Sequence, residues 1–236
     1  LAWSDSSPRY LGCRIPAAAV PWIEEPFGGA QTMQLVELIG YASAARLVVM
    51  SVPPTVRAYR MGTAGVSALT WWTIAAAVSM WLVYGLRTES TVLIVANVAS
   101  LVVTAATLLV LAHADSGRWF LSAAGIVCAL GLLLVVAMLV PLGVVIAGAV
   151  FLPIASRIPQ LRASVASYRA SERTSVSRAT WVLAATGQTG WLIYGVMLGD
   201  PALIVVNIVC LVMAIMLLTA DFANPGNRSP GLVAAG

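Results

Sequence analysis

One stretch of this sequence occurs twice. It reads Trp-Leu-Val-Tyr-Gly at residues 81–85 and Trp-Leu-Ile-Tyr-Gly at residues 191–195, and in each copy an asparagine, Asn97 or Asn207, follows twelve residues after the glycine. At the same offset of 110 residues, positions 66–103 and 176–213 are identical at 15 of 38 places. Apolar composition raises the number of chance matches, but it does not place Trp, Tyr, Gly and Asn in register. The pattern therefore indicates an internal duplication.

The composition of the chain points to a membrane. Hydrophobic residues make up 60% of the sequence and charged residues 9%, with a mean hydropathy of +0.93. Several apolar runs approach the roughly 20 residues that a helix needs to cross a bilayer, and they lack the alternation of a transmembrane barrel. We therefore predict an all-α integral membrane protein with seven transmembrane helices. The spans are expected at residues 33–53, 66–86, 91–111, 119–137, 139–158, 176–197 and 202–220.

The ends of the chain differ from this apolar body. Residues 1–32 are rich in proline and are interpreted as a disordered leader, or as a segment outside the natural protein. Residues 221–236 are rich in proline and glycine and are interpreted as a disordered tail. Three-helix repeats are expected at residues 33–111 and 139–220, with 119–137 as a linker helix between them.

The arginines predict the topology. The chain has no lysine, and nine arginines lie in the tail and in the loops expected on one side, against only Arg87 in the loops on the other. The positive-inside rule places the arginine-rich side and the C-terminus in the cytoplasm and the N-terminus outside. The membrane is expected to be the cell membrane. A single extra span between two three-helix units makes the units parallel, in a 3+1+3 arrangement, and such folds place a substrate path between the halves.

Together these features resemble the SWEET sugar-transporter family, its single-repeat semiSWEET relatives and the wider PQ-loop superfamily. The resemblance covers residues 33–220. It rests on the two three-helix repeats, on Pro53-Pro54 and Pro159-Gln160 at the ends of the first helices, on the basic loops that follow, and on the Trp-to-Asn spacing of sixteen residues.

The resemblance implies roles for individual residues. Pro53 and Pro159 would be hinges. The residues that would bind the substrate are Asn97, Asn207, Trp81 and Trp191. Those that would close the outer gate are Tyr84, Tyr194, Arg87 and Asp200.

Each of these roles has a structural alternative. The asparagine amides offer hydrogen bonds to sugar hydroxyls, but amides also join packed helices. The tryptophans can stack on a sugar ring or lie in the interfacial belt, as the tyrosines also can. Gln188 replaces Val78 of the first copy, and it either orients an asymmetric substrate or bonds a neighbouring backbone.

Arg46 departs from the family pattern, which is apolar at this position. Its counterpart in the second repeat, counted back from Pro159, is Leu152. An arginine inside a span contacts an anion, snorkels to an interface or faces another protomer. Arg46 is therefore a candidate contact for an anionic substrate.

These inferences favour a uniporter for a mono- or disaccharide that works by alternating access, because no acidic residue lies mid-membrane in the last six spans. The alternatives are a transporter of amino acids or another charged metabolite, and a membrane receptor or assembly protein of the same fold. No catalytic, metal-ligating or phosphate-binding motif is present, so we expect no enzyme, metal or cofactor. The expected partners are the substrate, the lipid bilayer and other copies of the chain, and not nucleic acid.

Overall fold

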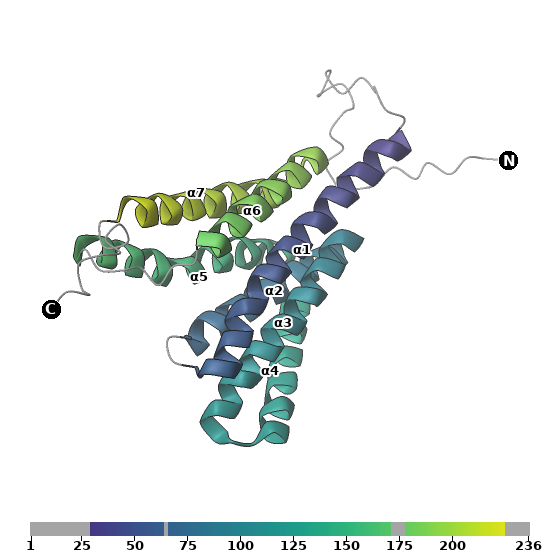
Figure 1. Ribbon diagram of the computed structural model, residues 1–236. Helices are drawn as coiled ribbons and strands as arrows, with labels where there is room; N and C mark the ends of the chain where they lie inside the picture. The colour runs from purple at the N-terminus through teal and green to yellow at the C-terminus, as the bar shows by residue number, and fades with distance from the viewer. Residues whose placement is uncertain (1–28, 64–65, 171–177, 225–236) are drawn as a thin grey trace. The chain divides into compact units, whose positions relative to one another are not determined.

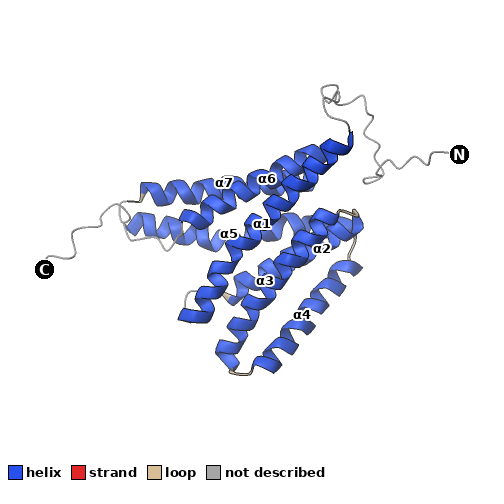
Figure 2. Ribbon diagram, turned by 45° about the vertical axis from the view of Figure 1, so that its right-hand side comes forward, coloured by secondary structure: helices blue, strands red, loops and turns tan. Residues whose placement is uncertain are grey.

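The computed structural model describes residues 29–63, 66–170 and 178–224, and all regular structure within them is helical (Figures 1 and 2). The prediction of seven helices and an all-α fold is confirmed. The helices are α1 (Gly29–Met61), α2 (Ala68–Arg87), α3 (Thr91–Ser116), α4 (Trp119–Leu139), α5 (Leu142–Ala170), α6 (Arg178–Leu198) and α7 (Pro201–Ala223). Six of these are long and apolar enough to cross a bilayer, and α6 is comparably long but more polar.

The first and fifth helices run past the ends predicted for them. Helix α1 continues through Pro53 and Pro54, and α5 continues through Pro153 and Pro159. Hydroxyl groups bond backbone carbonyls one turn earlier near the first pair of prolines, since Ser51 donates to Leu47 and Thr55 donates to Ser51. The predicted leader up to residue 28 and the predicted tail from residue 225 lie outside the described residues.

The two copies of the repeated stretch form equivalent helix pairs. Helix α2 packs on α3, and α6 packs on α7, side by side in both views (Figures 1 and 2). The repeated glycine allows this close packing. A Cβ at Gly85 would lie 2.9 Å from the Leu93 Cβ, and a Cβ at Gly195 would lie 2.8 Å from the Leu203 Cβ. The glycine of the Trp-Leu-x-Tyr-Gly stretch is therefore a packing residue in both copies.

Each pair continues through the same turn. Glu89 and Gly199, which are 110 residues apart, both have positive φ, at 55° and 65°. The next residues, Ser90 and Asp200, cap the N-termini of α3 and α7 with their side chains. The duplication therefore extends from the helix faces to the backbone of the connection.

The two halves meet at two equivalent helix contacts. Helix α5 packs on α2, where Gly148 lies against Met80. Helix α1 approaches α6, where Gly187 lies against Leu47 and Gly190 against Ser43. Helix α4 packs on α2 and α3, outside these contacts. The first helix of each half thus contacts the second helix of the other half.

Candidate functional site

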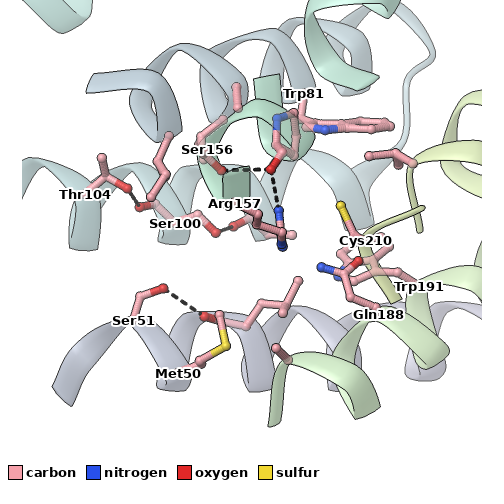
Figure 3. Close-up of a pocket in the computed structure, with 18 of the residues that line it drawn as sticks. Met50, Ser51, Trp81, Ser100, Thr104, Ser156, Arg157, Gln188, Trp191 and Cys210 are labelled. Atoms are coloured by element: carbon pink, nitrogen blue, oxygen red, sulfur yellow. Dashed lines mark hydrogen bonds between the residues drawn. The ribbon is translucent and has the colours of Figure 1, made fainter. Parts of the chain in front are cut away.

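A cavity of about 440 Å³ lies between the two halves (Figure 3). Its lining comes from α1, α2 and α3 of the first half and from α5, α6 and α7 of the second, and α4 does not contribute. This volume falls within the roughly 300–1,000 Å³ typical of small-molecule sites. The lining residues occur largely in matched pairs, at an offset of 110 residues in the second and third helices and 106 in the first.

The two asparagines line this cavity from opposite halves. The Asn97 Nδ2 donates to the Leu93 carbonyl at 2.8 Å, and the Asn207 Nδ2 donates to the Leu203 carbonyl at 2.7 Å. Each amide uses one of its two N–H groups in this way and makes no other hydrogen bond within the described part of the chain. One donor and the carbonyl oxygen of each amide remain for a solute.

Trp81 and Trp191 line the cavity at the same depth as the asparagines. Because α2 and α3 are antiparallel and Gly85 meets Leu93, the residue four positions before the glycine is level with the residue four positions after the leucine. Those residues are Trp81 and Asn97. The sixteen-residue spacing therefore brings an indole and an amide together in each half.

The tyrosines of the repeated stretch lie at the end of the cavity beyond the tryptophans. The Trp81–Tyr84 and Trp191–Tyr194 pairs are both edge-to-face, with ring centroids 5.5 and 5.4 Å apart. Tyr84 and Tyr194 are each 3% exposed, and neither lines the cavity.

Two hydrogen bonds join the halves at this end. The Tyr84 hydroxyl donates to the Asp200 Oδ2 at 2.8 Å, and the Tyr194 hydroxyl lies 3.2 Å from the Ser90 Oγ. Ser90 and Asp200 are equivalent positions, as are Tyr84 and Tyr194. In each bond, the tyrosine of one half therefore contacts the equivalent capping residue of the other half. Asp200 also accepts from the Ala202 and Leu203 amides, which fixes its carboxylate.

Arg87 takes no part in these bonds between the halves. Its guanidinium donates to the carbonyl of Met138, in the last turn of α4, and to that of Val140, just after the helix, at 2.7 and 3.0 Å. The structure brings Tyr84, Tyr194 and Asp200 together. The partner of Tyr194 at this end is Ser90 rather than the expected Arg87. Sequence reasoning missed Ser90, although the offset from Asp200 could have identified it.

The hinge candidates lie beside the cavity rather than in its lining. Pro53 and Pro159 are exposed, whereas Pro54 and Pro153 contribute to the wall. Trp71 and Trp181 line the cavity together with Thr70 and Thr180. They lie near the starts of α2 and α6, at the end opposite the tyrosines.

The polar side chains make the two halves of the cavity unlike. Gln188 lines the wall, is 5% exposed and forms no hydrogen bond with any described residue. Its amide faces a cavity in which the first half places Val78. Within the described chain, no group of His, Cys, Asp and Glu is arranged to hold a metal ion.

The arginine in the cavity is Arg157, not Arg46. Arg46 is exposed on α1 and does not belong to the lining, whereas Arg157 of α5 does. Arg157 is one of the nine arginines that the topology prediction assigned to the loops and the tail of one side. Aligning Pro53 with Pro159 pairs Arg157 with Ser51, and this register could have identified it.

Comparisons with known proteins address the fold. No family model matches the chain, and no curated protein matches it. A solved structure of a eukaryotic SWEET transporter superimposes with a TM-score of 0.61, covering 79% of this chain and 96% of that one at 15% sequence identity. The chain has a SWEET-like fold. Because that similarity spans nearly the whole of the solved chain, the SWEET-like fold includes helices of both halves.

Proposed function

We propose that the protein is a membrane uniporter that moves a small sugar by alternating access. The observation that carries this proposal is that equivalent asparagines and tryptophans from the two halves meet in one cavity, closed at one end by two equivalent bonds between the halves. The proposed substrate contacts are Asn97, Asn207, Trp81, Trp191 and Gln188.

The chemistry of these groups suits a sugar. Sugar hydroxyls donate and accept hydrogen bonds, and each asparagine amide has both functions available. The indole faces offer apolar surface to the C–H groups of a sugar ring.

Alternating access follows from the two closing bonds. With Tyr84–Asp200 and Tyr194–Ser90 formed, the tyrosine end is shut, and the proposed opposite opening lies between Trp71 and Trp181. Breaking both bonds while the halves rock about Pro53 and Pro159 would open the other end. The proposed topology makes the tyrosine end extracellular, with the N-terminus outside and the C-terminus in the cytoplasm, in the cell membrane. Assembly with further copies of the chain remains a prediction.

The test is uptake into liposomes that contain the purified protein. We expect labelled glucose or sucrose to equilibrate across the membrane, and Asn97→Ala or Asn207→Ala to slow uptake about tenfold or more, because each removes a polar contact worth about 1–2 kcal/mol. Thr189→Ala is the matched control, since Thr189 is exposed on α6 next to Gln188 and bonds the Ala185 carbonyl. Uptake of neither sugars nor charged metabolites would favour a receptor or assembly role instead.

A further inference from the structure

We propose that the substrate of this cavity is a sugar acid, a monosaccharide-sized polyol with one carboxylate, and that Arg157 binds the carboxylate. This inference rests on the proposed function, because it assigns the class of solute that the cavity carries. It starts from the charge of the lining, which contains Arg157 and, among the residues that the structure describes, no Asp or Glu.

Arg157 has no anionic partner among the residues that the structure describes. The ion pair identified in the described chain joins Arg178 to Asp221, away from the cavity lining. Arg157 is partly buried, and its Nη1 donates to the Pro153 carbonyl at 2.7 Å. A guanidinium has five N–H donors, so one edge can still form the two parallel bonds that a carboxylate accepts.

The position of the guanidinium suits a ligand that also reaches the asparagines. A helical side chain tilts toward the N-terminus of its helix, and the bond to Pro153 holds Arg157 one turn in that direction. Figure 3 shows the guanidinium inside the cavity, pointing toward the wall that carries Gln188 and Cys210. Cys210 is three residues, about 4.5 Å of helix rise, from Asn207. The wall toward which the guanidinium points therefore also carries Asn207.

Gln188 supports the same assignment from another helix. The residue is 5% exposed, lines the same wall and has no hydrogen-bond partner among the described residues. Its amide is therefore available to a polar ligand in the cavity. Gln188 thus places an amide where the first half has Val78, and Arg157 places a guanidinium where the first half has Ser51.

A carboxylate fits better than a phosphate. A single guanidinium balances one negative charge, and its planar fork matches the two oxygens of a carboxylate. A phosphate monoester carries close to two charges at neutral pH, and the described lining has no second cation.

The experiment measures uptake of labelled glucuronate and glucose by liposomes containing the full chain. We expect glucuronate to enter at least about tenfold faster than glucose at equal, subsaturating concentration. Arg157→Gln should lower glucuronate uptake about 10- to 100-fold, as expected for loss of a charged hydrogen-bonded contact, and change glucose uptake less than about threefold. Arg157→Lys should fall in between, because it keeps the charge and loses the fork.

Arg46→Gln is the matched control, since Arg46 is the exposed arginine outside the cavity, and it should leave both rates unchanged. An inside-positive potential should accelerate glucuronate uptake and leave glucose uptake unaffected, because a monoanion carries charge. Quenching of tryptophan fluorescence by each solute then separates a lost binding contact from a misfolded variant.

Glucose uptake as fast as glucuronate uptake, both unchanged in Arg157→Gln, would overturn the carboxylate assignment and leave the sugar transporter standing. A monodisperse Arg157→Gln protein that has lost binding of both solutes would also overturn it, by showing a structural role. Uptake of neither solute by the unaltered protein would overturn the proposed transport function itself.

Discussion

The tyrosine end of the cavity and the cavity wall differ in how faithfully the halves repeat each other. At the tyrosine end, the edge-to-face Trp–Tyr pairs, the glycine contacts, the positive-φ turns and the bonds between the halves all occur twice. In the wall, the asparagines and tryptophans are repeated, but the second copy has Arg157 in place of Ser51 and Gln188 in place of Val78. The contacts that join the halves at the tyrosine end are therefore repeated, whereas some of the polar residues that face the cavity are not.

This difference indicates separate physical demands. The tyrosine end must pack and close, so a change in one copy strains a contact that both halves share. The cavity wall only needs to complement a solute. An asymmetric solute is bound best by an asymmetric wall, so the two copies there can carry different side chains without disturbing the fold.

The largest expected effect is a loss of thermal stability when the repeated glycine of the tyrosine end is changed. Gly85→Ala and Gly195→Ala each place a Cβ within 2.9 Å or less of a leucine Cβ and about 3.2–3.3 Å from a backbone nitrogen. Overpacking of this kind destabilises by about 1–3 kcal/mol, and both variants should melt at similarly reduced temperatures in detergent. Gly125→Ala in α4, where nothing lies within 4 Å, is the control and should be neutral or slightly stabilising. Equal melting of all three variants would show that close packing does not explain the repeated glycine.

A smaller effect separates the two closing bonds. Tyr84→Phe removes a bond to a carboxylate, whereas Tyr194→Phe removes a bond to a hydroxyl, and charge-assisted bonds are roughly twice as strong. Cys210 in the cavity wall reports opening through its reaction with an impermeant thiol reagent, in a Cys13→Ser, Cys128→Ser background. Reagent added at the tyrosine end should react about tenfold faster in Tyr84→Phe and about threefold faster in Tyr194→Phe.

Tyr168→Phe is the control for the closing bonds, because Tyr168 is exposed on α5 and does not line the cavity. Its labelling rate should match that of the unaltered protein. Equal acceleration in Tyr84→Phe and Tyr194→Phe would mean that the charge of Asp200 does not strengthen the closure.

The smallest effect concerns the turn. Glu89 adopts a positive φ at which the second copy has Gly199, and such a conformation is unfavourable for a residue with a side chain. Glu89→Gly should stabilise the protein by about 0.5–1 kcal/mol, visible as a modest rise in melting temperature. Gly199→Ala should do the opposite by a similar amount. A fall in stability for Glu89→Gly would show that the Glu89 side chain contributes more than its backbone strain removes.

The helical fold could be predicted from the sequence because its causes are local. Long apolar runs dictate helices in a bilayer, and the register of Trp, Tyr, Gly and Asn reveals the duplication. The lengths of α1 and α5 could not be predicted with the same rule, since proline normally ends a helix. Hydroxyl bonds from Ser51 and Thr55 accompany the continuation of α1 past its two prolines, and they depend on where those side chains point.

The candidate site divides in the same way. The equivalence of Asn97 with Asn207, and of Trp81 with Trp191, could be recognised from the sequence, because equivalence is a matter of spacing along the chain. The folded structure was needed to show that Ser90 bonds Tyr194, that Arg87 bonds carbonyls at the end of α4 and just after it, and that Arg157 rather than Arg46 reaches the cavity. Both arginines lie in helices that border the cavity, and a rotation of about 100° per residue determines which helix face carries each of them.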